Sequence, residues 1–282
     1  MTENTERDTV LVTAATGKTG RRVARRLLER GATVRAGSRR GEGPGGTVFD
    51  WESPATWAPA LSGADAAYVA YYPDLAYPGA VEAMRAFGRA AADAGVRRLV
   101  LLSGRGEPEA EAAESALRDA GVDLTVVRAA FFAQNFSEGA LAEGVAQGRI
   151  PFPAGSTAEP FIDLEDLADV VTAALTEEGH AGSVYEVTGP RLLTFDEAAA
   201  EIGAAAGRPV SYVPVSEDEF RGMLPELGFS ESDASWLARL FAMLMDGHNA
   251  STTDDVRRVL GRAPRDFTAF AREAAGEVVR GG

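Results

Sequence analysis

The sequence contains no cysteine, which excludes disulfide bonds, thiolate nucleophiles and cysteine-ligated metals. Lysine occurs once, at Lys18, and histidine occurs twice, at His180 and His248. No apolar run approaches the roughly 20 residues of a membrane-spanning helix, and the polar, acidic residues 1–8 do not resemble a signal peptide. We therefore expect a soluble, cytoplasmic protein.

Positive charge is also scarce, because 28 Lys and Arg stand against 42 Asp and Glu, for a net charge of -14. A nucleic-acid surface needs clustered Lys and Arg to neutralise phosphates, so we expect a small-molecule substrate and neither a nucleic-acid nor a membrane partner. The 282 residues suffice for one large α/β domain, alone or with a smaller appendage. The use of arginine in place of lysine, with abundant Ala and Gly, is typical of a GC-rich bacterial genome.

Short β-type runs alternate with amphipathic segments of ten to fifteen residues over the first 130 positions. This alternation is typical of βαβ crossovers and predicts a Rossmann-type doubly wound parallel sheet in an α/β fold. The expected strands are 9–13, 33–38, 47–50, 66–71, 98–103 and 124–128, and the expected helices are 18–30, 79–94 and 109–120.

The pattern loosens after residue 130 and becomes mostly helical after Ser216. We predict a nucleotide-binding core in residues 1–130, with 161–190 returning to the sheet, and a smaller, mostly helical substrate cap in 131–160 and 190–282. Further expected strands are 183–188 and 210–215, further helices are 164–176 and 194–206, and the candidate apolar anchors of the cap are Phe220, Leu224, Trp236, Leu240 and Phe241.

The stretch VLVTAATGKTG, residues 10–20, joins the first strand to the first helix. A nucleotide-triphosphate loop would need glycine where Val12 stands, so that interpretation fails. Small residues followed by Gly17 and Gly20 instead favour a turn whose backbone approaches a pyrophosphate at a helix N-terminus. The alternative is a tight strand-to-helix turn that binds nothing.

The end of the second strand indicates which dinucleotide is bound. An acid at this position binds the ribose of NAD, whereas an arginine accommodates the 2′-phosphate of NADP. The sequence has Ser38, Arg39 and Arg40 there, and no acid until Glu42. We therefore expect NADP(H), with Arg39 on the phosphate, Ser38 donating a hydrogen bond and Lys18 nearby; the alternative is a pair of solvated arginines.

Several motifs, in order and spacing, resemble the NmrA-like group of atypical short-chain dehydrogenases/reductases, which includes NADPH-dependent quinone and azo reductases, isoflavone-reductase relatives and redox-sensing regulators. The resemblance covers nearly the whole chain. It rests on TAATGKTG (13–20), GSRR (37–40), LVLLSG (99–104), GVDLTVVRAAFFAQNF (121–136), FIDLEDLADVVTAAL (161–175), YEVTGPRLLTFDEAA (185–199) and DVRRVLGRAPRDFTAFARE (255–273).

The resemblance implies positions for the cofactor and the substrate. The implied cofactor contacts are Thr13, Ala15, Thr16, Gly17, Lys18, Thr19, Gly20, Ser38, Arg39, Asp50, Tyr71, Tyr72, Ser103 and Phe131. The candidate substrate contacts are Tyr72, Phe132, Gln134, Asn135 and His248, where core packing is the alternative for the two phenylalanines and an exposed turn is the alternative for His248.

Two departures from the family pattern matter. Ala14 stands at the first motif glycine, which is tolerable if that residue keeps an ordinary φ. The Tyr-x-x-x-Lys dyad of ordinary members of the superfamily, in which lysine lowers the pKa of tyrosine, cannot form because the sole lysine, Lys18, lies in the glycine turn. Residues 107–115 offer only acids and alanine where some relatives have His or Lys, so the candidate catalytic groups are Tyr71, Ser103 and Asn135.

Hydride transfer needs a dedicated proton donor least when the product anion is stabilised by resonance. We therefore expect an NADPH-dependent oxidoreductase that acts on a flat conjugated carbonyl or quinone-like molecule, in secondary metabolism or detoxification. The alternatives are an NADP(H)-binding sensor without turnover and a lyase or cyclase that reuses the fold.

Two other groups of residues receive structural interpretations. Asp163, Glu165 and Asp166 are more typical of a helix start than of a metal site, so no metal is expected. The aromatic residues could line a pocket for a flat substrate or simply pack in the core; they are Trp51, Trp57, Tyr68, Tyr71, Tyr72 and Tyr77. His180 is expected to be a plain loop residue.

Overall fold

The computed structural model describes residues 8–139 and 141–280, with side chains up to residue 275. The chain divides into two compact units. The first unit runs through Ala129 and includes Leu164–Glu186 and Arg258–Gly261. The second unit contains Ala130–Asp163, Val187–Arg257 and the chain from Arg262 onward.

The first unit is built on a seven-stranded sheet in the order β3-β2-β1-β4-β5-β6-β9. The pairs from β3 to β6 are all parallel, as the alternation of strands and helices predicts. The strands are β1 (Thr9–Val12), β2 (Thr33–Ser38), β3 (Gly46–Val48), β4 (Ala66–Val69), β5 (Arg98–Gly104), β6 (Asp123–Ala129) and β9 (Val184–Val187).

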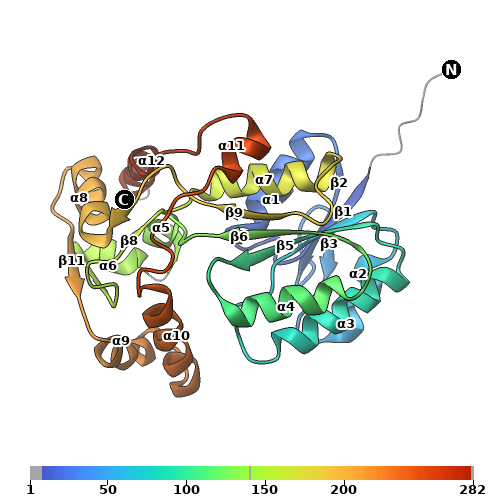
Figure 1. Cartoon of the computed structure of the whole chain (residues 1–282), viewed down its shortest axis with the longest axis horizontal. Helices are drawn as coiled ribbons and strands as arrows, with labels where there is room; N and C mark the ends of the chain where they lie inside the picture. Colours follow the sequence, from blue (N-terminus) through green and yellow to red (C-terminus); the bar gives the residue numbers. More distant parts are fainter. Residues whose placement is uncertain (1–7, 140, 281–282) are drawn as a thin grey trace. The chain divides into compact units, whose positions relative to one another are not determined.

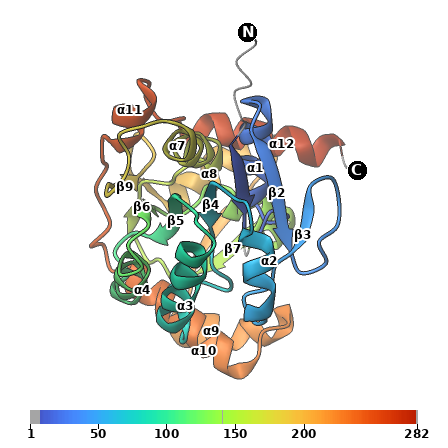
Figure 2. The same cartoon turned by 90° about the vertical axis from the view of Figure 1, so that its right-hand side faces the viewer.

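Helices cover both faces of this sheet. Figures 1 and 2 show α1 and α7 on one face and α2, α3 and α4 on the other. The helices are α1 (Gly20–Glu29), α2 (Trp57–Leu61), α3 (Ala80–Asp93), α4 (Pro108–Arg118) and α7 (Leu164–Thr176), with a 3-10 turn at Pro54–Thr56 before α2. The prediction of a doubly wound sheet is confirmed, whereas α2 was not expected.

The aromatic residues after β3 pack in the core of the first unit. The ring centroid of Trp51 lies 4.9 Å from that of Phe49, 5.6 Å from that of Trp57, and 5.1 Å from those of Tyr71 and Phe87. Trp57 is 3% exposed. Packing therefore explains Trp51 and Trp57, and a substrate-lining role is not needed for them.

The second unit contains two small sheets and several helices. Strands β7 (Arg149–Phe152) and β11 (Ser211–Pro214) pair in parallel, and β8 (Ala158–Glu159) and β10 (Leu193–Thr194) pair antiparallel. The helices are α5 (Asn135–Glu138), α6 (Ala142–Gln147), α8 (Phe195–Ala206), α9 (Glu217–Met223), α10 (Glu231–Leu244), α11 (Asp255–Leu260), whose last residues belong to the first unit, and α12 (Phe267–Arg280), with a 3-10 turn at Leu224–Leu227.

Phenylalanine dominates the core of the second unit. The ring of Phe131 lies within 6.0 Å of those of Phe152, Phe161, Phe195 and Phe241. Such edge-to-face clusters stabilise a core beyond the burial of area alone. Of the expected anchors, Phe220, Leu224 and Leu240 are buried, Phe241 packs against this core, and Trp236 is half-buried.

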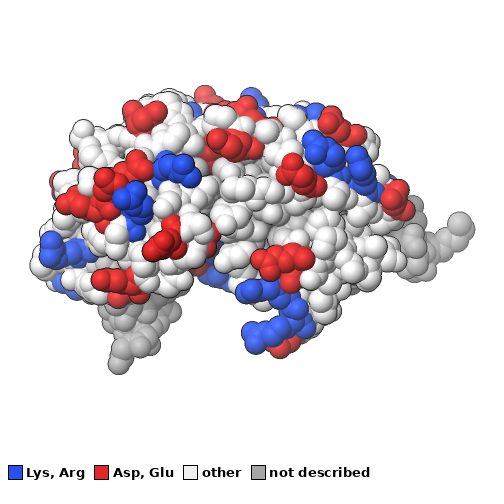
Figure 3. Space-filling model, turned by 90° about the horizontal axis from the view of Figure 1, so that it is seen from below, with Lys and Arg blue, Asp and Glu red and all other residues white. Residues whose placement is uncertain are grey.

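The surface carries both signs of charge. On the face that Figure 3 shows, acidic and basic side chains are interspersed, and no extended basic patch covers it. None of the described helices has the length and apolar run that a membrane crossing requires.

Candidate dinucleotide site

Thr13 ties the end of β1 to the end of β4. Its hydroxyl accepts a hydrogen bond from the amide of Ala70 at 2.8 Å and donates to the carbonyl of Tyr68 at 3.1 Å. The Thr13 amide also donates to the Tyr68 carbonyl, at 3.0 Å. Thr13 is fully buried, so its side chain fixes the edge of the sheet from which the glycine turn begins.

The turn after β1 is too tight for side chains at its glycines. A Cβ on Gly20 would lie 2.3 Å from the carbonyl oxygen of Ala14, and one on Gly17 would lie 3.1 Å from the same oxygen. Ala14 itself has φ of +50°. The condition under which alanine would be tolerated without strain, an ordinary φ, is therefore not met, because the turn needs the left-handed conformation that glycine adopts without strain.

Backbone amides at the start of α1 are available for an anion. Within the part of the chain that the structure describes, the amides of Thr16, Thr19 and Gly20 have no partner. Thr19 stands at the N-cap position of α1 and makes no side-chain capping bond to the helix. Unpaired amides together with the positive end of the helix dipole are the arrangement that binds phosphate groups.

The residues after β2 and β3 lie at the same edge of the sheet. Ser38 accepts a hydrogen bond from the Gly41 amide at 3.0 Å, and its main chain pairs with Val48 of β3. Arg39 is exposed and forms no ion pair with any side chain described in residues 8–139 and 141–275. Asp50 follows β3, where its carboxylate accepts from the Glu52 amide at 3.1 Å.

Two tyrosines follow β4. Burial, together with the charges of Glu52 and Glu82, raises the pKa of Tyr71 above its ordinary value. This shift is opposite to the lowering that lysine gives the tyrosine of a Tyr-x-x-x-Lys dyad, so the Tyr71 phenol keeps its proton. Tyr72 is 70% exposed, which leaves its ring free to lie against a ligand.

Ser103, at the end of β5, belongs to a buried polar network. Its hydroxyl donates to Glu114 at 2.6 Å, and Arg128 makes two bonds to the same carboxylate, at 2.7 and 2.9 Å. The register of β5 and β6 places Ser103 directly beside Arg128, so both side chains reach α4. Because the single hydroxyl proton of Ser103 is already donated to Glu114, the catalytic prediction for Ser103 has no support from this geometry.

The remaining predicted residues lie in the second unit. Phe131 is part of its aromatic core, and Phe132 is half-buried and forms a single parallel bridge with Ile162. Gln134 is 4% exposed and donates to Asp163 at 2.7 Å, so its amide has a structural partner. Asn135 is the half-buried first residue of α5.

Both histidines have hydrogen-bond partners. The Nδ1 of His248 lies within hydrogen-bond distance of the Asp246 carboxylate, in a turn after α10. The Nδ1 of His180 lies 2.8 Å from the Tyr185 hydroxyl, and Thr125 donates to the His180 carbonyl at 2.8 Å. His180 is therefore more than a plain loop residue, because it joins the segment before β9 to β6.

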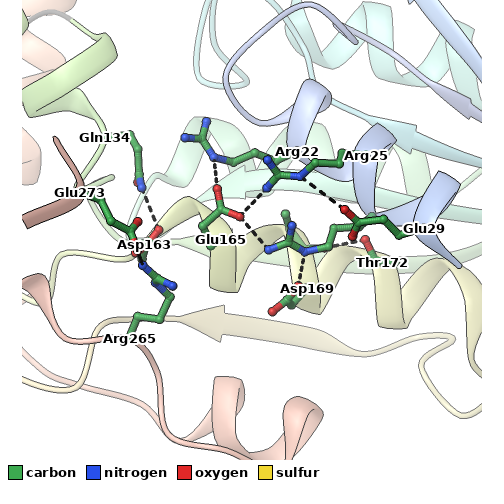
Figure 4. A network of polar contacts seen from close by, with 12 residues as sticks. Arg22, Arg25, Glu29, Gln134, Asp163, Glu165, Asp169, Thr172, Arg265 and Glu273 are labelled. Atoms are coloured by element: carbon green, nitrogen blue, oxygen red, sulfur yellow. Dashed lines mark hydrogen bonds and ion pairs between the residues drawn. The ribbon is translucent and has the colours of Figure 1, made fainter. Parts of the chain in front are cut away.

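The carboxylates at the start of α7 bind arginines. Glu165 receives bonds of 2.7 Å from each of Arg22, Arg25 and Arg26 of α1 (Figure 4). Asp163, in the second unit, accepts at 2.7 Å from Gln134 and from Arg265. The described residues include no group of three or more His, Asp or Glu side chains placed to hold a metal.

Two carboxyl groups near the carboxyl ends of β4 and β5 were not predicted as site residues from the sequence. Glu107 follows β5 and is 6% exposed, and Asp74 follows β4 and is half-buried. Burial and the charge of Asp74 raise the pKa of Glu107 to about 8. The sequence does place an acid shortly after each of two neighbouring strands, which could have indicated a pair of carboxyl groups. The residues that follow Glu107 are mostly acids and alanine, however, and such a stretch resembles the solvated start of a helix.

Residues 14–178 match the family model described as NAD(P)H-binding. The chain belongs to this NAD(P)H-binding family. The unpaired amides at α1 and the space that only glycine leaves at position 20 fit the pyrophosphate of the dinucleotide.

Two relatives of similar length are named as reductases, and the protein is an NAD(P)H-dependent oxidoreductase. An NAD(P)H azoreductase from Xenophilus azovorans is 32% identical over 94% of this chain and 98% of its own. A (4-alkanoyl-5-oxo-2,5-dihydrofuran-3-yl)methyl phosphate reductase from Streptomyces griseus is 33% identical over 94% of this chain and 98% of its own.

Solved structures show the same fold. A Citrobacter triphenylmethane reductase complexed with NADP(H) has a TM-score of 0.75 at 24% identity, covering 94% of this chain and 99% of its own. An Escherichia coli NADPH-dependent quinone oxidoreductase complexed with NADPH has a TM-score of 0.73 at 21% identity, covering 96% and 99%.

Proposed function

We propose that this member of the NAD(P)H-binding family prefers NADPH and reduces a flat conjugated carbonyl or quinone-like small molecule. The observation that carries the cofactor preference is Arg39, an exposed guanidinium directly after β2 with no ion pair among the described residues. The relatives named for azo compounds and for an oxo-dihydrofuran support a conjugated acceptor.

The residues around β2 can distinguish the two nicotinamide cofactors. An arginine at a strand end can pair with the 2′-phosphate and stack on the adenine. The chain has no acid at this strand end to bind a free 2′-hydroxyl before Glu42, and Glu42 lies 3.5 Å from Arg40. Ser38 and Arg39 therefore favour the phosphorylated ribose.

The acceptor chemistry follows from the absence of a tyrosine–lysine pair that could donate the proton. NADPH, when bound, supplies a hydride. Lys18 is the sole lysine and lies in the glycine turn, and the raised pKa of Tyr71 makes its phenol a weak acid. A quinone or enone suits such a site because resonance stabilises the anion that hydride addition leaves.

The direct test is to titrate NADPH and NADH by fluorescence and then to follow NADPH absorbance with a panel of quinones, enones and azo compounds. We expect tighter binding of NADPH and its consumption by at least one conjugated acceptor. Binding without consumption on any acceptor would contradict a reductase and favour a cofactor sensor. Equal affinity for the two nucleotides would contradict the role of Arg39.

The substitution Arg39→Ala tests the cofactor preference. A charge-assisted bond contributes about 1.5–3 kcal/mol, and each 1.4 kcal/mol corresponds to a factor of ten. We therefore expect the Kd for NADPH to rise about 10- to 100-fold while the Kd for NADH stays unchanged. Arg40→Ala, the same change at the next exposed residue, is the control and should leave both constants nearly unaltered.

A further inference from the structure

The carboxyl group of Glu107 is buried and has no ion-pair partner among the described residues. The residue is 6% exposed, and its Oε2 atom is buried and has no hydrogen-bond partner among the described residues. It stands at the N-cap position of α4 but makes no side-chain bond to the helix. A buried, unpaired carboxylate is costly, so such a group holds a proton instead.

The carboxyl group occupies the place of a strand side chain. Gly104, the last residue of β5, has no Cβ, and one built there would lie 1.9 Å from Oε1 of Glu107. The Glu107 carboxyl therefore lies against the bare backbone of Gly104, at the carboxyl end of a central strand. Ligands of doubly wound sheets bind outside these strand ends.

The strand order places this carboxyl on the nicotinamide side of the sheet. The order reverses between β1 and β4, with β2 and β3 on one side and β5 and β6 on the other. The dinucleotide lies across this point of reversal. With Arg39 after β2 on the adenosine side, the loops after β4 and β5 belong to the nicotinamide half.

Burial and the surrounding negative charges both favour the protonated form of Glu107. Burial raises the pKa of Glu107 most, followed by the charges of Asp74, Glu109 and Glu114, to about 8. The nearby arginines are engaged elsewhere, since Arg128 binds Glu114 at 2.7 Å and Arg105 binds Glu186 at 2.8 Å. The positive end of the α4 dipole opposes this rise in pKa. However, the Glu107 side chain accepts no capping hydrogen bond from the backbone amides of α4.

We propose that the carboxyl group of Glu107, poised by Asp74, delivers the proton that completes reduction of the acceptor. This role rests on the proposed reductase function. The acceptor gains a hydride from NADPH and a proton from Glu107, leaving oxidised cofactor and the Glu107 carboxylate. Water then reprotonates Glu107. The pair thus replaces the proton donor that the missing tyrosine–lysine dyad supplies in ordinary relatives.

The first test uses Glu107→Gln, which keeps the shape of the side chain and removes the acidic proton. With an enone and saturating NADPH, kcat should fall about 100-fold or more, as for loss of a general acid, while NADPH affinity stays unchanged. Wild-type kcat should fall above about pH 8, and the variant should lose this break. Glu111→Gln, an exposed glutamate on α4 that is not among the charges raising the pKa of Glu107, is the matched control and should keep both the rate and the break.

The second test changes the neighbour of Glu107. Asp74→Asn removes a negative charge that raises the pKa of Glu107, so the break in the rate profile should move to lower pH. A purely structural role for either carboxyl would not move this break. An unchanged kcat in Glu107→Gln, or an unmoved break in Asp74→Asn, would overturn the proposal.

Infrared spectroscopy measures the proton without turnover. The carbonyl stretch of a protonated carboxyl group should be present near pH 7 in wild type, disappear near pH 10 and be missing in Glu107→Gln. Absence of this difference band would overturn the proposal even if the enzyme reduces its acceptor. If the band is present but no acceptor consumes NADPH, the reductase function fails, and the catalytic role of Glu107 fails with it.

Discussion

Ala14 has a φ of +50°, the only positive φ of a described residue other than glycine. The left-handed conformation costs an L-residue roughly 1–2 kcal/mol. The strain is maintained because the Ala14 carbonyl accepts the Gly17 amide at 2.8 Å and lies over the bare Cα of Gly20. The shape of the glycine turn thus requires one strained residue.

Ala14→Gly should relieve this strain. We expect the free energy of unfolding to rise by about 0.5–1 kcal/mol, since glycine loses part of the gain through its more flexible unfolded chain. Urea denaturation measures the change. Ala15→Gly is the matched control, because Ala15 has no positive φ, is 8% exposed and should lose stability on the same substitution. A loss of stability in both variants would contradict the strain at Ala14.

Residue roles were harder to predict from the sequence than residue positions. The position of Ser103 at the end of β5 was correct, but its partner Glu114 lies eleven residues away on α4 and became apparent only in the structure. Glu107 could not be predicted because its raised pKa depends on burial. That burial depends on the missing side chain of Gly104, and the nearby charge of Asp74 comes from the loop after β4.

At the scale of elements, α1 and α7 are joined by ion pairs across one face of the sheet. Glu165 of α7 is 19% exposed at its side chain and binds Arg22, Arg25 and Arg26, and Asp169 also binds Arg26 (Figure 4). Partly buried networks of this kind are worth more than isolated surface pairs. They hold the helix whose first turn carries the amides of Thr19 and Gly20, which are unpaired within the described part of the chain.

Glu165→Gln should loosen this attachment. Removing the carboxylate leaves three arginines without their shared partner, and we expect a loss of about 1–3 kcal/mol in the free energy of unfolding. Hydrogen exchange should accelerate in α1. The control is Glu177→Gln, whose partner Arg30 is 43% exposed at its side chain and which should cost less than about 0.5 kcal/mol. Equal effects of the two substitutions would show that the network adds nothing.

The elements themselves differ in how well the sequence predicts them. The central strands of the first unit are short apolar runs with turn residues at both ends, so their periodicity was sufficient. Strands β7 and β11 pair although about 60 residues separate them, and β8 and β10 pair over only two residues each. Long-range pairing of short segments leaves no local pattern, which is why β7, β8 and β10 were missed.

At the scale of the whole molecule, stability depends on pH through carboxyl groups whose pKa values the fold shifts in opposite directions. Burial alone would raise the pKa of Glu165, but hydrogen bonds from Arg22 and Arg26 outweigh it and lower the pKa. The Arg191 hydrogen bond lowers the pKa of Asp266. These carboxylates stabilise the fold fully above the unfolded pKa values of about 4, and this stability is lost as pH falls through the lowered values.

Glu107 acts in the opposite direction. Its pKa is about 8 in the folded protein, against an ordinary value of 4.5 for a glutamate side chain. Between these values the folded state binds a proton that the unfolded state releases, so the free energy of unfolding falls as pH rises through this window. A difference of one between the folded and unfolded pKa values corresponds to about 1.4 kcal/mol. The protein should therefore be most stable on the acidic side of neutrality.

The substitution Glu107→Gln isolates this contribution from the general repulsion within a chain of net charge -14. The variant carries a neutral side chain at every pH, so its stability relative to wild type should increase steadily from pH 5 to pH 8 and level off above. Urea unfolding at pH 5, 6.5, 8 and 9 measures the difference. A constant difference across this range would mean that Glu107 is already ionised in the folded protein at pH 5, and that its burial is compensated by groups other than its own proton.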